Sequence, residues 1–197
     1  MLVEHRGSRP TIHSDAWVAP TATVIGDVTV EAGARILHGA VVTSEDGSIS
    51  IGGNTVVMEN ALVRARAGHD VVIGASVMIG PHAHVNGATI GDGVFVATGA
   101  SLFPGSSVGD GAEVRINAVV QVNTRLEPGA VVPIGWVAVG ESILSPDRHD
   151  EIWEIQRGLD FPGTVYGADR ETTMEELMRR QSEFYGAHRD DVAVEEN

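Results

Sequence analysis

The chain has 197 residues, enough for one domain with an appendage. Its formal net charge of −14 excludes nucleic acid as an expected partner, because an acidic surface repels phosphate. The absence of Cys excludes disulfides and thiolate metal sites. We find neither a secretory signal nor an apolar run approaching about 20 residues, so we expect a cytoplasmic protein that does not enter a membrane.

An aliphatic residue recurs every sixth position along most of the chain. The runs with this spacing are Val18–Val42, Ile51–Val63, Ile73–Val85 and Ile90–Val132. A period of six fits neither an α-helix nor a plain hairpin sheet. It predicts an all-β solenoid, a left-handed parallel β-helix of hexapeptide repeats over residues 1–144, in which each hexapeptide forms one flat face and then turns a corner. The number of repeats predicts roughly six coils.

Three breaks interrupt the repeat. Thr43–Ser50 and Arg64–Val72 are insertions, and the repeat Val85–Thr89 is one residue short. Insertions in solenoids become loops on one side, which is often the binding side. We therefore expect the functional site beside these loops.

The repeat stops after about Val137, and residues 145–187 are predicted to form C-terminal α-helices. The first begins at Ser145-Pro146 and ends at Gly158, and the second begins at a capping box at Thr172-Thr173. The helices must bury their apolar sides on their own prism or on a neighbouring subunit.

The remaining C-terminal segments are predicted to be irregular. Leu159–Tyr166 is interpreted as an irregular linker because it contains Pro162 and Gly163. Residues 188–197 are interpreted as a frayed polar tail. We expect His5 and His188, which lie near the two ends of the chain, to be solvated.

Two segments, Pro20–Val30 and Ile79–Asp92, resemble the γ-class carbonic anhydrases. The resemblance covers roughly residues 10–145 and includes the interruptions of the repeat. It implies a homotrimer of parallel prisms with each active site in the cleft between two subunits. It also implies a catalytic divalent metal, bound by three His from two subunits.

The positions that the resemblance assigns to those three ligands hold Arg64, Pro81 and Asn86. Arg is cationic, Pro has no donor atom, and an Asn amide is a poor zinc ligand. Of the acidic positions beside the metal, Glu45 and Glu59 keep a carboxylate. The resemblance therefore implies a rebuilt intersubunit site without efficient zinc-dependent CO2 hydration.

Three interpretations of the rebuilt cleft remain open. A shifted metal site, with zinc as the candidate ion, would use imidazoles from His69, His82 and His84. A metal-free site would have Glu59, Arg64, His82, His84 and Asn86 as catalytic residues, with Glu45 and Arg66 binding the substrate. There His is the base and the arginines clamp a small anion. In the third interpretation Arg64 forms a structural salt bridge with Glu59 or Glu45 at the trimer interface, without catalysis.

Three functions follow, because function depends on the site and not on the fold. The first is a γ-carbonic-anhydrase-like protein, a lyase if active, that binds or acts on a small anionic molecule. The second is a hexapeptide acyltransferase that uses His82 or His84 as its base. The third is a non-catalytic assembly subunit.

Overall fold

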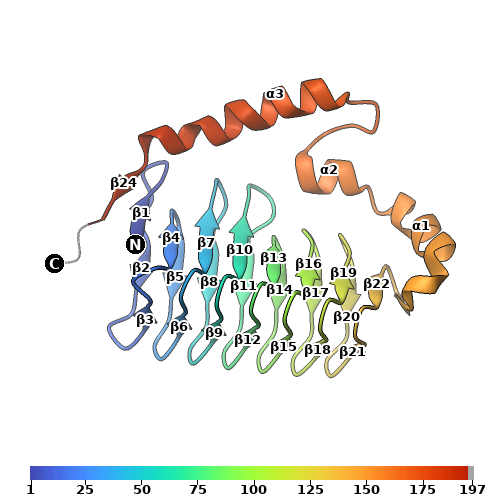
Figure 1. Cartoon of the computed structure of the whole chain (residues 1–197), viewed down its shortest axis with the longest axis horizontal. Coiled ribbons are helices and arrows are strands. Elements are labelled where there is room, and N and C mark those ends of the chain that lie inside the picture. The colour runs from blue at the N-terminus through green and yellow to red at the C-terminus, as the bar shows by residue number, and fades with distance from the viewer. Residues whose placement is uncertain (195–197) are drawn as a thin grey trace.

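The computed structural model describes residues 1–194 as a β-helix with three flat faces, followed by helices (Figure 1). The first face contains the parallel strands β1 (Leu2–Glu4), β4 (Thr23–Ile25), β7 (Val41–Ser44), β10 (Leu62–Ala65), β13 (His84–Asn86), β16 (Ser101–Leu102), β19 (Val119–Val120) and β22 (Val137–Val139). The second contains β2 (Thr11–Ile12), β5 (Val28–Val30), β8 (Ile49–Ile51), β11 (Val71–Ile73), β14 (Thr89–Ile90), β17 (Ser107–Val108) and β20 (Arg125–Leu126). The third contains β3 (Trp17–Val18), β6 (Arg35–Ile36), β9 (Val56–Val57), β12 (Met78–Ile79), β15 (Phe95–Val96), β18 (Glu113–Val114) and β21 (Val131–Val132).

This architecture confirms the predicted left-handed β-helix of hexapeptide repeats. The prediction of roughly six coils was too low, because the first face has eight parallel strands among the described residues. Strands β1, β2 and β22 lie outside the six-residue runs and were not counted.

The core is a stack of aliphatic side chains inside the prism. Every member of the four runs is buried except Val18, which is partly buried against the core. On the first face, Val63, Val85 and Leu102 pair in register on successive strands, so each coil covers the one before it. Burying each such side chain contributes about 1.5–3 kcal/mol.

The corners of the prism require left-handed backbone. Asn60, Asn117 and Asn123 have φ of +58°, +56° and +54°. Gly105 has φ +74°, and a Cβ atom there would overlap Oδ1 of Asn123 in the next coil. Asn and Gly are the residues that adopt this conformation at the lowest cost.

The two predicted insertions form loops that extend β7 and β10 beyond the prism on the side of the first face (Figure 1). The loops are hydrogen-bonded to each other. The Ala67 amide donates to Asp46 at 2.8 Å, and the Ser48 amide donates to Asp70 at 2.7 Å. The two inserted loops therefore hold each other in place beside the first face.

The C-terminal segments fold back over these loops. Short 3-10 helices η1 (Pro146–Arg148) and η2 (Gly186–Asp190) flank α1 (His149–Gly158), α2 (Phe161–Tyr166) and α3 (Met174–Tyr185). Figure 1 shows α3 above the first face, returning from α2 to the first coil. Within the chain, α3 contacts the prism through Gln181 and Phe184, which meet Arg66. Packing of the helices on a neighbouring subunit stays a prediction. None of the helices in residues 1–194 has the length and apolar character needed to cross a membrane.

The prediction of an irregular linker at Leu159–Tyr166 was wrong, because residues 161–166 form α2. Asp160 caps this helix by accepting from the Gly163 amide, and Pro162 occupies the first turn, where its missing N–H costs nothing. The Thr173 side chain caps α3 by accepting from the Glu176 amide, one residue after Thr172, the first position of the predicted capping box.

The last described segment is ordered. Strand β24 (Val192–Ala193) pairs antiparallel with β1, and β23 (Ser142–Leu144) pairs antiparallel with β22. Of the predicted polar tail, residues 195–197 lie outside the described part of the chain. The domain limits at residues 144 and 187 stay a prediction.

Candidate functional site

Three of the predicted site residues lie together on the outer side of the first face. Val63 and Val85 point into the prism, so Arg64 on β10 and His84 and Asn86 on β13 point outward by strand alternation. Arg64 pairs in register with Asn86, and Leu62 pairs with His84. The structure therefore groups a guanidinium, an imidazole and an amide on neighbouring strands.

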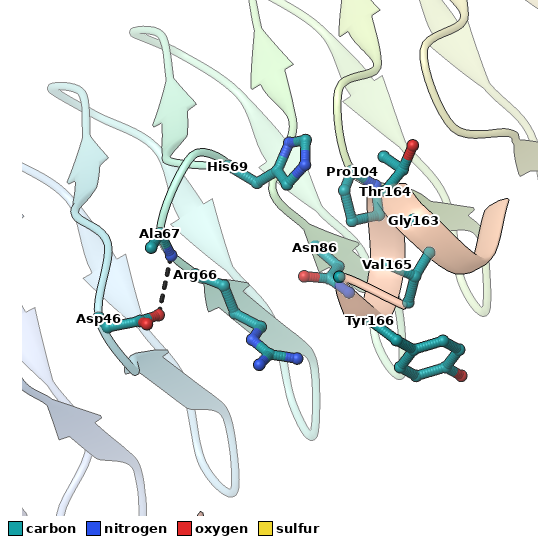
Figure 2. Close-up of a pocket in the computed structure, with 11 residues that line it drawn as sticks. Asp46, Arg66, Ala67, His69, Asn86, Pro104, Gly163, Thr164, Val165 and Tyr166 are labelled. Carbon is teal, nitrogen blue, oxygen red and sulfur yellow. Dashed lines mark hydrogen bonds between the residues drawn. The ribbon is translucent and has the colours of Figure 1, made fainter. Parts of the chain in front are cut away.

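A pocket of about 180 Å³ lies between the loop after β10 and α2 (Figure 2). The solenoid supplies Arg66, His69 and Asn86, and α2 supplies Thr164 and Tyr166. Sequence reasoning missed the second wall, because Pro162 and Gly163 were interpreted as linker residues. The capping position of Asp160 was the signal that could have revealed α2.

Arg64 and Arg66 are held by aromatic rings of α3. The Arg66 guanidinium carbon lies 4.1 Å from the ring centroid of Phe184, and that of Arg64 lies 5.8 Å from Tyr185. Arg66 also donates to Oε1 of Gln181 at 3.2 Å. In an otherwise acidic protein, these contacts place two cations side by side under one helix.

Neither arginine forms an ion pair with Asp or Glu among residues 1–194; the arginines that do are elsewhere. Nε of Arg64 is buried and has no hydrogen-bond partner in that part of the chain. The predicted salt bridge from Arg64 to Glu59 or Glu45 is therefore not formed within one chain, and its intersubunit version stays a prediction. A buried donor without an acceptor costs about 1–3 kcal/mol.

His84 is the best placed base of this group. Burial lowers the pKa of His84, and the nearby positive charge of Arg64 lowers it further. The ring packs edge-on against Phe103, with centroids 6.0 Å apart. His84 is therefore neutral near pH 7 and has a lone pair for a proton or a donor.

His82 and Glu59 lie apart from the pocket, at the corner between the third and first faces. His82 is exposed with φ +57°, and its amide donates to the Glu59 carbonyl at 3.1 Å. Strand alternation does not apply at a corner, so it does not bring His82 to the side of His84. Roles for His82 and Glu59 at a subunit interface stay predictions.

Glu45 belongs to a separate group at the end of the prism, which we call the end cluster: His5, Glu45, His188 and Asp191. Glu45 Oε2 lies 2.9 Å from Nε2 of His188. Asp191 contacts Nδ1 of His5 at 2.5 Å and Nδ1 of His188 at 2.8 Å. Glu45 therefore contacts Thr43 and His188, and its predicted role in substrate binding with Arg66 stays a prediction.

The prediction that His5 and His188 are solvated was wrong. His5 is 2% exposed, and its ring stacks on His188 with centroids 4.4 Å apart. The contacts of the end cluster join residues 143 and 186 positions apart, so no local sequence signal could reveal them. The pairing of β24 with β1 brings them together.

The charges of the end cluster support each other. Burial alone would lower the pKa of His188, but hydrogen bonding to Asp191 and the charge of Glu45 outweigh it and raise the pKa. Burial likewise opposes ionisation of Asp191, yet His188 and His5 hold its pKa below the ordinary value. The two carboxylates thus favour the protonated form of the His188 ring over the neutral form.

The residues present do not fit zinc at the positions implied by the resemblance, because Arg64 and Asn86 offer a cation and an amide. The predicted trio His69, His82 and His84 does not bring its ligand atoms together within one chain. In residues 1–194 the one such group with ligand atoms within 4.8 Å of one another is His5, Glu45 and His188. A site of the predicted trio across subunits stays a prediction.

Comparisons with known proteins confirm the resemblance. No protein-family model matches the chain. It is 35% identical over 87 residues to gamma carbonic anhydrase 1, mitochondrial, of Arabidopsis thaliana, covering 41% of this chain and 32% of the relative. For gamma carbonic anhydrase 3, mitochondrial, of the same plant the identity is 37%, with 41% and 34% covered. The chain thus spans about a third of the length of the curated relatives it matches.

Solved structures with similar architecture show the fold. A putative acetyltransferase of Bacillus cereus superposes with a TM-score of 0.57 at 18% identity, covering 79% of this chain and 90% of that one. A UDP-N-acetylglucosamine acyltransferase of Francisella novicida gives 0.56 at 16% identity, covering 91% and 86%. The chain is similar to γ-carbonic anhydrases in sequence and to hexapeptide acyltransferases in shape.

Proposed function

We propose that this γ-carbonic-anhydrase-like chain binds a small anionic molecule through Arg64 and Arg66, in a rebuilt site without zinc-hydroxide chemistry. The observation that carries the proposal is the pair of adjacent arginines without a carboxylate partner in residues 1–194, one with a buried, unpartnered Nε. The chain has 27 acidic residues against 13 basic ones, so the lack of a partner carboxylate here is notable.

An anion between the arginines would offset the repulsion between their two positive charges. It would also give the buried Nε of Arg64 a hydrogen-bond acceptor. It would accept hydrogen bonds from two guanidinium groups, which suit planar carboxylate or tetrahedral phosphate oxygens. The Asn86 amide lies beside them and can donate a further bond. Arg66 and Asn86 line the pocket of about 180 Å³, together with Asp46, and Arg64 lies beside it on β10. A space of this size favours an ion of the size of bicarbonate, acetate or phosphate over a nucleotide.

His84 is the base that we assign to any turnover at this site. It is neutral near pH 7 because burial and Arg64 lower its pKa. A neutral imidazole beside a bound anion can take a proton from the substrate or from water. A lyase of the γ-carbonic-anhydrase type would need this step in place of a metal-bound hydroxide.

A homotrimer, as the resemblance implies, is part of the proposal. Exposed apolar side chains line the third face and its corner with the first face, among them Met78, Val131, Ile116 and Ile134. The same corner carries His82 and Glu59, which would then face a neighbouring subunit. The cytoplasmic location predicted from the sequence belongs to the same proposal.

The test is calorimetric titration of the full chain with bicarbonate, acetate and phosphate, compared with Arg64→Met and Arg66→Met. We expect binding of at least one anion, weakened about tenfold or more by each substitution. Arg115→Met is the matched control, because Arg115 already pairs with Glu113 outside the pocket. No binding, or binding that both substitutions leave unchanged, would contradict the proposal.

Two further measurements separate the alternatives. Zinc-dependent CO2 hydration in a stopped-flow assay would contradict the loss of metal chemistry. The second measurement is of coenzyme A binding and acyl transfer in the wild type and in His84→Asn. A variant that still binds coenzyme A but no longer transfers the acyl group would favour the acyltransferase. The solved structures support that alternative through their fold alone. A stable trimer with none of these activities would leave the non-catalytic subunit.

A further inference from the structure

We propose that the end cluster is a binding site for a divalent transition-metal ion, with His5, Glu45 and His188 as ligands. This site is distinct from the anion pocket and from the positions that the carbonic anhydrase resemblance assigns to metal. Two imidazoles and one carboxylate form a donor set that suits zinc or cobalt and leaves a further position open. The ligand atoms lie within 4.8 Å of one another. A zinc ion shared by the three side chains would form bonds of about 2.0–2.2 Å to them.

Asp191 orients both imidazoles, as carboxylates beside metal sites commonly do by binding the ring nitrogen that does not bind the metal. One carboxylate oxygen contacts Nδ1 of His5 at 2.5 Å and the other contacts Nδ1 of His188 at 2.8 Å. With both Nδ1 protons held there, Nε2 of each ring becomes the ligand atom. Nε2 of His188 already lies 2.9 Å from the Glu45 carboxylate.

A hydrogen bond from Thr43 also holds the Glu45 carboxylate in position. Its Oε1 accepts from the Thr43 hydroxyl at 3.2 Å, which leaves Oε2 for the site. Glu45 is 3% exposed and His5 2% exposed, so the donors are preformed and buried. A buried carboxylate needs a cation or hydrogen-bond donors, and Nε2 of His188, 2.9 Å away, is the group that faces Oε2 of Glu45.

An open space adjoins the ligands. A cavity of about 340 Å³ is lined by His5, Glu45 and Arg6 together with the carboxylates of Asp27 and Asp46. It gives an ion and its remaining water a route to the site, and the acidic lining favours a cation.

Arg6 competes with the metal. Its Nε donates to Nε2 of His5 at 3.2 Å, which shows that this nitrogen carries a lone pair. Arg6 is exposed, and its guanidinium also donates to the Phe184 carbonyl at 3.2 Å and lies 5.1 Å from the Phe184 ring centroid, so it has other partners when an ion takes Nε2 of His5. Removing Arg6 should therefore strengthen metal binding, whereas removing a member of a merely structural network would not.

The experiment uses the untagged full chain, stripped with a chelator and titrated with Zn2+ by calorimetry and with Co2+ by visible absorption. We expect one ion per chain, with a tetrahedral Co2+ spectrum. His188→Asn and Glu45→Gln should abolish binding, and Asp191→Asn should weaken it about 10-fold to 100-fold. Arg6→Ala should bind more tightly than the wild type.

Matched variants keep the result interpretable. His149→Asn removes an exposed His on α1 and should bind as the wild type does. His84→Asn should also leave binding unchanged. His188 is partly exposed and near the chain end, so its substitution should preserve the fold, which far-UV circular dichroism checks.

Two outcomes would overturn the proposal. One is the absence of Zn2+ and Co2+ binding in both the wild type and Arg6→Ala. The other is binding that survives His188→Asn and Glu45→Gln but is lost in His84→Asn, which would favour the site predicted from the sequence. Neither outcome bears on anion binding by Arg64 and Arg66.

Discussion

The regular coils of the prism and its interrupted coils are built on the same core but differ in what they present to solvent. From Ile90 to Val132 every strand has two residues, and a left-handed corner follows each. In the interrupted coils, β7 and β10 have four residues and lead into loops. The arginines, His69, His84 and Asn86 all lie in or beside the interrupted coils.

Functional residues of this solenoid are concentrated where the six-residue repeat is interrupted. A hexapeptide that keeps its period has its inward and corner positions fixed by packing and backbone conformation. An insertion releases residues from that constraint without disturbing the inward column, since Val42 and Val63 remain buried. Stability should therefore depend on the regular positions and binding on the interruptions.

The largest expected effect breaks the core of a regular coil. Leu102 is fully buried and pairs in register with Val85 and Val120. Leu102→Ala should lower the free energy of unfolding in urea by about 2–5 kcal/mol, because it leaves a cavity in the stack. Arg66→Met in the interrupted coil should lower it by less than about 1 kcal/mol. Equal losses in the two variants would remove the distinction between the regions.

A smaller loss of stability is expected at the corners, where one glycine of a regular coil can be compared with one of an inserted loop. Gly105 in a regular coil and Gly68 in an inserted loop both have positive φ, +74° and +79°. Ala at either position should cost about 1–2 kcal/mol for left-handed backbone. At Gly105 the new Cβ would also meet Asn123, whereas nothing lies within 4 Å at Gly68. Urea unfolding should therefore show a larger loss for Gly105→Ala, and a loss no larger than that of Gly68→Ala would contradict stacking at the corners.

The smallest expected effect is local and concerns the interrupted coils alone. Burial and Arg64 both lower the pKa of His84, in that order of importance. Arg64→Met should raise this pKa part of the way toward the ordinary value, because burial remains. An NMR titration of the ring protons measures the change, with Arg115→Met as the control that leaves it unaltered. A pKa that does not move would mean that the two side chains do not interact in solution.

The core and the face of the pocket could be predicted from the sequence because their signals are periodic. The six-residue spacing of aliphatic residues identifies Val63 and Val85 as inward, and this alone places Arg64, His84 and Asn86 outward on adjacent strands. The breaks in the period located the side on which the pocket lies.

The covering elements could not be predicted from the same signals. Helix α2 has one local signal, the capping residue Asp160 before Pro162, and its left-handed backbone together with Gly163 made the segment resemble a linker. The end cluster depends on a contact between His5 and Asp191 across nearly the whole chain. Such contacts follow from the path of α3 and not from any spacing in the sequence.

The antiparallel strands at the two ends of the prism also bear on polymerisation. A stack of parallel strands offers unpaired N–H and C=O groups at each end, and another molecule could dock there and begin a fibre. β24 occupies this position on β1, and β23 occupies it on β22, each with only two or three residues. A molecule adding in register to the first face would first have to displace one of these caps. The two segments therefore oppose end-to-end growth through the first face, whereas the outermost strands of the other two faces, β2, β20, β3 and β21, carry no antiparallel cap in residues 1–194.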